Sequence, residues 1–158
     1  MSKLRLAARV AVRTPDNAIF LFRYDDAQFG RHWAMPGGGL EGDESYRVGA
    51  YRELVEETGW TDLVLGSLLW TWQVNFTRLG EQVSQYEQVF LAEGPERDPK
   101  GDLTKSHADD EILEWRWWTP SEVEATSDPL WPPPLATLLS RLRERAAPGP
   151  AVHLGVLA

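Results

Sequence analysis

Three glutamates stand close together in the segment from Gly38 to Trp60, GGLEGDESYRVGAYRELVEETGW. Glu53, Glu56 and Glu57 have the spacing i, i+3, i+4, so on a helix their side chains fall within an arc of ~100°. Carboxylates gathered on one side of a helix repel one another unless a cation offsets them. Because a hard divalent cation prefers oxygen ligands, the spacing predicts a metal site.

The helix that must carry these glutamates has signals at both ends. The residues from Asp43 to Ser45 are good N-caps, and Gly59 fits the position after the last turn, where a left-handed conformation is needed. An apolar stripe predicts that the helix packs on a core: Val48, Ala50, Tyr51, Leu54 and Val55. Glycines before the helix allow a tight turn that brings main chain close to a phosphate or metal: Gly37, Gly38, Gly39 and Gly42.

Two charged residues of the same segment can support the glutamates. Arg52 precedes Glu56 by four residues, so its guanidinium can fix that carboxylate by bidentate pairing; the alternative is an ordinary surface ion pair. Glu44 lies at the start of the predicted helix, where an acid interacts favourably with the helix dipole.

This segment resembles the signature of the Nudix hydrolase family, which reads G, five residues, E, seven residues, then R-E-U-x-E-E-x-G-U with U a bulky aliphatic residue. Gly38, Glu44 and the run RELVEETGW from Arg52 to Trp60 match it at every polar and glycine position. Trp60 is the one departure, at a position that packs rather than reacts, so we expect a local adjustment of the core. The resemblance implies water attack on phosphorus in a nucleoside diphosphate derivative, with Mg²⁺, or Mn²⁺ as a substitute.

The resemblance also implies roles for individual residues. Arg52 would orient Glu53, and Glu44 would assist from an outer shell, an assignment that we leave open against a capping role. One of Glu53, Glu56 and Glu57, or a glutamate outside the segment, would activate the water. The implied metal site combines a main-chain carbonyl with three carboxylates: Gly37 or Gly38, Glu53, Glu56 and Glu57.

Further acids lie outside this segment. Glu111 is the first candidate for an additional metal or base carboxylate, and a solvated acidic loop is the alternative for its group: Asp109, Asp110, Glu111 and Glu114. Glu87 shares a strand face with Gln85 and is a second candidate to line the cleft, although a surface acid is the favoured interpretation. The histidines do not cluster in the sequence, and none is assigned a catalytic role: His32, His107 and His153.

The remaining patterns predict an α/β protein with a mixed sheet sandwiched between helices, the Nudix fold by resemblance. Strands are expected at 4–13, 18–22, 33–35, 63–76, 82–92 and 112–118, with loops at 25–32 and 93–110. A capping box begins a short helix at Thr119, and a leucine-striped helix spans 135–145 on the other side of the sheet from the glutamate helix. We expect one domain over 1–147 and a C-terminal surface tail over 148–158.

The composition indicates which kinds of molecule the protein can bind. The chain has 158 residues, a formal net charge of −8 and no cysteine. An acidic protein is a poor partner for polymeric nucleic acid or an anionic membrane, whereas a bound metal can reverse the local charge for a small phosphorylated ligand. The eight tryptophans fit core positions for the most part, with base stacking as the alternative. With no long apolar run, we expect a soluble, cytoplasmic protein.

Other functions remain open at this point. A non-catalytic Nudix-fold module that binds or senses a nucleotide is the runner-up, and an isomerase of a diphosphate ester is the third. The complete set of carboxylates favours hydrolysis over both. The substrate is a small nucleotide or other diphosphate that the sequence does not identify, and a homodimer is compatible with the resemblance.

Overall fold

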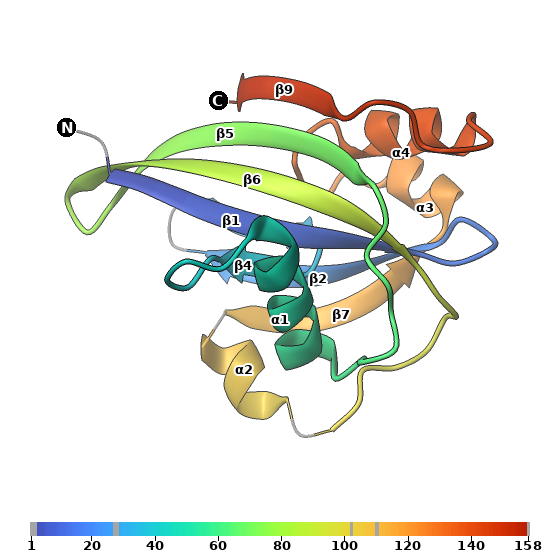
Figure 1. Ribbon diagram of the computed structural model, residues 1–158, viewed down its shortest axis with the longest axis horizontal. Helices are drawn as coiled ribbons and strands as arrows, with labels where there is room; N and C mark the ends of the chain where they lie inside the picture. Colours follow the sequence, from blue (N-terminus) through green and yellow to red (C-terminus); the bar gives the residue numbers. More distant parts are fainter. Residues whose placement is uncertain (1–2, 27–28, 102, 110, 158) are drawn as a thin grey trace.

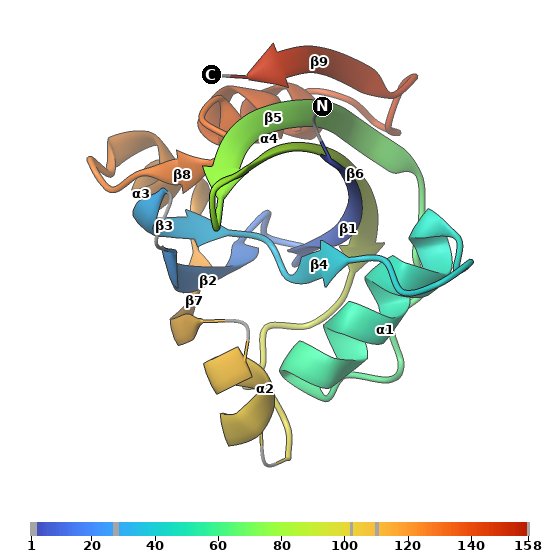
Figure 2. The same ribbon diagram turned by 90° about the vertical axis from the view of Figure 1, so that its left-hand side faces the viewer.

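The computed structural model describes residues 3–26, 29–101, 103–109 and 111–157. Its elements are, in chain order, β1 (Lys3–Arg13), β2 (Ile19–Asp26), β3 (Gly30–Ala34), β4 (Gly37–Gly39), α1 (Tyr46–Thr58), β5 (Leu68–Arg78), β6 (Glu81–Glu93), α2 (Thr104–Asp109), β7 (Ile112–Trp118), α3 (Pro120–Ala125), β8 (Leu130–Trp131), α4 (Leu135–Arg143) and β9 (Val152–Leu157). The strands form a strongly curled sheet, with α1 and α2 away from α3 and α4 (Figures 1 and 2).

The sheet is mixed, as the sequence predicts. Its strand order is β8-β3-β2-β1-β6-β5-β9, while β4 also pairs with β1 and β7 with β2. β1 runs parallel to β6 and antiparallel to β2. The glycine strand β4 pairs with the middle of β1, where Gly38 lies opposite Ala8. This pairing holds the glycine-rich segment beside β1 just before the chain enters α1.

Two apolar cores lie on opposite faces of β1. Val10 packs in the core that contains Ala50 and Leu54 of α1, whereas its neighbour Ala11 packs in the core that contains the leucines of α4. The leucine stripe of α4 is fully buried, as predicted: Leu135, Leu138, Leu139 and Leu142. Each such leucine contributes about 1.5–3 kcal/mol through burial. The predicted arrangement of helices on both sides of a mixed sheet is therefore confirmed.

Two predicted boundaries were wrong. The expected loop at 25–32 is mostly strand, because β2 continues to Asp26 and β3 begins at Gly30; the rings of Tyr24 and His32 stack across this hairpin at 5.7 Å. The strand expected from residue 63 begins only at Leu68. Residues 63–67 instead run alongside β6, where the N–H of Gly66 donates to the carbonyl of Leu91.

Two further segments have more structure than expected. The loop predicted at 93–110 contains the short helix α2, and the ring Nε2 of its His107 lies 2.7 Å from the carbonyl oxygen of Glu57. The C-terminal tail, which was expected to lie on the surface, includes β9, which pairs in parallel with β5, and Leu154 of this strand packs against the core. Across the described residues, no helix is long and apolar enough to cross a membrane.

Candidate active site

The two ends of α1 place its glutamates. The hydroxyl of Ser45 accepts a hydrogen bond from the N–H of Val48 at 3.2 Å, which makes Ser45 the N-cap. Gly59 ends the helix with φ 74°, and a Cβ there would lie 2.3 Å from the carbonyl oxygen of Lys100. The glutamates therefore occupy the last two turns, where the helix dipole disfavours negative charge. The carboxylates therefore do not stabilise the helix. Their presence at this end is better explained by a function that requires them.

Arg52 forms hydrogen bonds with three of the glutamates at this site. Its Nε and Nη2 donate to the two carboxylate oxygens of Glu44, at 3.1 and 2.6 Å. Its Nη1 donates to Glu53 at 3.2 Å and to Glu56 at 3.3 Å, and Nη2 also reaches the carbonyl of Gly39 at 3.1 Å. The hydrogen bond to Glu44 raises the pKa of Arg52, burial opposes the rise, and the charge of Glu53 adds to it. The predicted Arg52–Glu56 pair is present, within a larger network.

The three glutamates differ in their exposure to solvent. Glu57 is completely buried and accepts a hydrogen bond from the N–H of Gly37 at 2.8 Å. Glu53 is buried with 8% of its surface exposed, whereas the side chain of Glu56 is 49% exposed. Burying a carboxylate is costly unless hydrogen bonds or cations compensate it. Glu53 and Glu57 are therefore fixed by the protein, while Glu56 is the carboxylate that meets water.

The glycine turn is shaped around these carboxylates. A Cβ at Gly38 would lie 2.8 Å from Oε1 of Glu53. A Cβ at Gly37 would lie 2.3 Å from the carbonyl oxygen of Ala8. Since any side chain at these positions would collide with the sheet or with Glu53, both glycines are required for the close approach of main chain to the glutamates.

Glu44 acts through Arg52. Ser45 is the N-cap and no acid occupies the first turn of α1, so the alternative role of a first-turn acid was wrong. The carboxylate accepts hydrogen bonds from Arg52 and from the N–H of Glu41 at 2.7 Å. The bond from Arg52, followed by that from Glu41, lowers the pKa of the Glu44 carboxyl. Glu44 thus fixes the position of Arg52, which in turn donates hydrogen bonds to Glu53 and Glu56.

The oxygen donors of this site fit a hard divalent cation. They are the carboxylates of α1 together with the main chain of the glycine turn, which Gly38 leaves unobstructed. Among the described residues, no group of three or more His, Cys, Asp or Glu side chains is already arranged to enclose a metal ion. Arg52 binds both Glu53 and Glu56 here, so the arginine itself offsets part of their charge.

Two acids of the group around Glu111, namely Glu111 and Glu114, are exposed on the surface. Glu111 is exposed in the turn between α2 and β7 with φ 61°, and its carbonyl accepts a hydrogen bond from the N–H of Asp25. Glu114 pairs with Arg23 at 2.8 Å on the exposed side of the sheet. Asp110 and the side chain of Asp109 lie outside what the structure describes. For Glu111 and Glu114 the arrangement matches the solvated acidic loop that the sequence left as the alternative, and Glu111 stays a prediction as a site residue.

Glu87 is not a surface acid, so the favoured interpretation from sequence was wrong. It is 1% exposed and forms an ion pair with Arg9. Its carboxylate also accepts hydrogen bonds from Gln85 at 3.1 Å and from Trp72 and Trp131, both at 3.3 Å. The predicted shared face with Gln85 is correct, but the curl of the sheet turns that face inward. Glu87 therefore ties two tryptophans to β1.

Sequence reasoning missed the arginines of β1. Arg5, Arg9 and Arg13 are four residues apart, so they share one face of the strand, with the small residues Ala7 and Ala11 between them. Arg9 donates to the carbonyl of Met35 at 2.9 Å, next to the glycine turn. Burial disfavours its charge, but Glu87 outweighs this and the pKa of Arg9 is raised. Their spacing by an even number of residues, which places them on one face of a strand, was the available signal.

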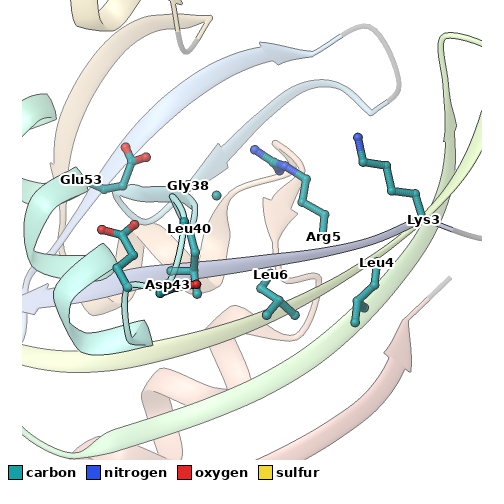
Figure 3. A pocket seen from close by; sticks show the side chains of 11 residues that line it. Lys3, Leu4, Arg5, Leu6, Gly38, Leu40, Asp43 and Glu53 are labelled. Carbon is teal, nitrogen blue, oxygen red and sulfur yellow. The ribbon is translucent and has the colours of Figure 1, made fainter.

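A cleft of about 550 Å³ opens beside the glutamates (Figure 3). Its walls come from the first residues of β1, the glycine turn, the segment that precedes α1 and one glutamate of α1. The lining residues are Lys3, Leu4, Arg5, Leu6, Gly38, Gly39, Leu40, Gly42, Asp43, Glu44 and Glu53. The site can therefore bring an anionic group of a small molecule next to Glu53.

Most tryptophans are core residues, as predicted. Trp60, Trp72 and Trp118 have at most 1% of their surface exposed. Trp60, the one departure from the family signature, packs edge-on against Phe20 at 4.8 Å and donates to the carbonyl of Asp98. The larger ring is thus accommodated in the core behind α1, away from the glutamates.

Comparison with known proteins gives a consistent result. The family model described as NUDIX domain matches residues 3–141. An RNA pyrophosphohydrolase of Pelagibacter ubique (strain HTCC1062) is 30% identical over 122 residues, which are 72% of this chain and 75% of that protein. Nudix hydrolase 25 of Arabidopsis thaliana is 33% identical over 104 residues, which are 58% of this chain and 59% of the plant protein, less than two thirds of its length.

Solved structures share the fold. A NUDIX hydrolase from Nitrosomonas europaea superposes with a TM-score of 0.70 at 22% identity, covering 99% of this chain and 80% of that one. A MutT protein from Methanosarcina mazei Go1 has a TM-score of 0.66 at 23% identity, covering 90% and 95%. At these identities the likeness concerns the fold, and the chemistry rests on the residues described above.

Proposed function

This chain belongs to the Nudix family, and on that premise we propose that it hydrolyses a pyrophosphate bond in a nucleoside diphosphate derivative, with Mg²⁺ as the metal and Mn²⁺ as a substitute. The observation that carries the proposal is the network in which Arg52 contacts Glu44, Glu53 and Glu56 while the glycine turn contacts Glu57. This network presents carboxylates beside a cleft that admits a small anion.

Each residue of the network has a task in this proposal. Glu53, Glu56 and Glu57 would hold the metal with a carbonyl of the glycine turn, and the metal would supply positive charge for the phosphates and activate water. Arg52 and Glu44 keep Glu53 and Glu56 in place. Glu56 is the most exposed of the three glutamates, which favours it as the group that accepts a proton from the attacking water.

Water attack on phosphorus would release two phosphorylated products. The acidic chain carries many carboxylates that repel a pyrophosphate, so the positive charge of the metal is needed for the two to meet. The similarity to an RNA pyrophosphohydrolase adds the 5′ end of an RNA to the substrates worth testing, although the net charge of −8 favours a small nucleotide. The cytoplasmic location stays a prediction.

A substrate panel in ¹⁸O-labelled water tests the proposal. Nucleoside triphosphates, nucleotide sugars, ADP-ribose, dinucleoside polyphosphates and a 5′-triphosphorylated oligoribonucleotide would each be incubated with Mg²⁺, Mn²⁺ or EDTA, and the products weighed by mass spectrometry. We expect cleavage of at least one substrate between two phosphates, with label in one product and no reaction in EDTA. Tight binding without cleavage would contradict hydrolysis and support the nucleotide-sensing alternative.

A further inference from the structure

The start of β1 places two basic side chains in the cleft beside the glutamates. Figure 3 shows Lys3 and Arg5 on one side of the strand, the side toward which Glu53 points, with Leu4 and Leu6 on the other. Lys3 is exposed and Arg5 is partly buried. Alternation places these two basic side chains on the same face of the strand, and both line the cleft.

Arg5 differs from the other arginines on its face of β1. Arg9 is paired with Glu87, and Arg13 with Glu93 at 3.1 Å. The hydrogen-bond partner of Arg5 is Gln85, a neutral amide, and no carboxylate within the described ranges forms an ion pair with it.

The surroundings of Arg5 disfavour its positive charge. Burial lowers the pKa of Arg5, the nearby charges of Arg9 and Arg78 lower it further, and those of Glu87 and Glu53 act in the opposite direction. A partly buried guanidinium among other cations is stabilised when an anion binds it. The bond to Gln85 engages one nitrogen, Nη1, of a group that has five N–H donors.

The glycine turn brings the guanidinium close to the glutamates. A Cβ at Gly39 would lie 2.9 Å from Nη2 of Arg5, and one at the adjacent Gly38 would lie 2.8 Å from Oε1 of Glu53. Consecutive glycines thus make room for a cation and for a carboxylate at the same cleft. A chain of phosphates that begins on a metal at Glu53 therefore has Arg5, and then Lys3, as its next positive contacts.

We propose that Arg5, assisted by Lys3, binds a substrate phosphate beyond those held by the glutamates, so that the enzyme prefers substrates carrying three or more linked phosphates. This rests on the proposed function and names its substrate class. A guanidinium suits a phosphate because its planar fork forms two parallel hydrogen bonds. The neutral terminal sugar of ADP-ribose or a nucleotide sugar offers no charge to compensate Arg5.

Binding of analogues that resist cleavage tests this inference separately from turnover. Calorimetry with Mg²⁺ would compare an analogue of ATP in which methylene groups replace both bridging oxygens between the phosphates with the α,β-methylene analogue of ADP, which has one phosphate fewer. We expect the wild type to bind the triphosphate analogue more tightly. Arg5→Gln should weaken that binding about tenfold, the size of one charge-assisted hydrogen bond, and change binding of the diphosphate analogue less than about twofold.

Matched variants make the outcome specific. Arg13→Gln removes the same charge from the same face of β1, at a residue paired with the exposed Glu93, and should leave both affinities unchanged. Arg5→Lys keeps the charge without the fork and should restore part of the lost affinity. Equal affinity of the wild type for both analogues, or equal losses for both in Arg5→Gln, would overturn the proposal. Because no cleavage is measured, absence of hydrolysis would count against the proposed function alone.

Discussion

The guanidinium of Arg52 donates hydrogen bonds to both carboxylate oxygens of Glu44, at 2.6 and 3.1 Å, across eight residues of sequence. The same guanidinium reaches Glu53 and Glu56 with its remaining donor nitrogen. An ion pair between the helix and the segment before it therefore helps to position two carboxylates of the helix. The geometry of the proposed active site depends on this pair as much as on the glutamates themselves.

Arg52→Lys should separate positioning from charge. An ammonium group keeps the positive charge but cannot hold Glu44 at two oxygens while reaching Glu53 and Glu56. We expect kcat on the best substrate to fall about tenfold or more, the effect of one lost charge-assisted hydrogen bond, with KM changed less. Arg47→Lys on the exposed side of α1 is the control and should retain wild-type kcat. Equal kcat in both variants would show that Arg52 has no positioning role.

Glu44 should contribute to the pH dependence of stability. Its pKa is lowered in the folded protein, so its contribution is fully present above the unfolded pKa and is lost as the pH falls through the folded one. Between neutral pH and about pH 3, the melting temperature should therefore fall less in Glu44→Gln than in the wild type. If the melting temperatures of the two proteins fell equally with pH, the stabilising ion pair between Arg52 and Glu44 would be refuted.

Gly38→Ala should impair catalysis more than folding. The new methyl group would lie 2.8 Å from Oε1 of Glu53 and would push that carboxylate from its position. Gly94→Ala is a matched control, because its Cβ would meet the end of the Leu63 side chain at 2.6 Å, away from the glutamates. We expect similar melting temperatures, and a loss of kcat of about tenfold or more only in Gly38→Ala. A fully active Gly38→Ala would mean that Glu53 needs no such clearance.

Glu87→Gln should destabilise the sheet. It keeps the shape of the side chain but leaves Arg9 as an uncompensated buried charge, which costs about 3–5 kcal/mol. Urea unfolding should report a loss of this size. Glu93→Gln, which removes the partly exposed pair with Arg13, should cost less than about 1 kcal/mol. Equal losses in the two variants would contradict the distinction between a buried and an exposed pair.

The helix that carries the site could be predicted because its signals are local. The N-cap at Ser45, the terminal Gly59 and the glutamate spacing are all read within one segment, and the structure agrees with the predicted caps. The same holds for the capping box at Thr119 and the leucine stripe of α4. Local hydrogen bonds and helical periodicity determine these features, so no knowledge of distant residues is needed.

The features that were missed depend on distant partners. Glu87 is buried only because β6 pairs with β1 and the sheet curls over it, which the pattern of β6 alone does not reveal. β9 forms because the main chain of β5 accepts it, and its own residues carry only a weak strand signal. Arg5 acquires its place in the cleft from the register of β4 against β1. Sheet register and curvature arise from the whole fold.

The most direct measurement of the central claim is the turnover of Glu56→Gln and Glu57→Gln on the best substrate of the panel with saturating Mg²⁺. Each variant keeps its side-chain volume, and circular dichroism and melting would verify that the fold is intact. The glutamates are proposed to hold the metal and activate water, so we expect kcat to fall by about 10²–10⁴-fold in at least one variant and substantially in both. Wild-type turnover in both folded variants would contradict the assignment of α1 as the catalytic helix.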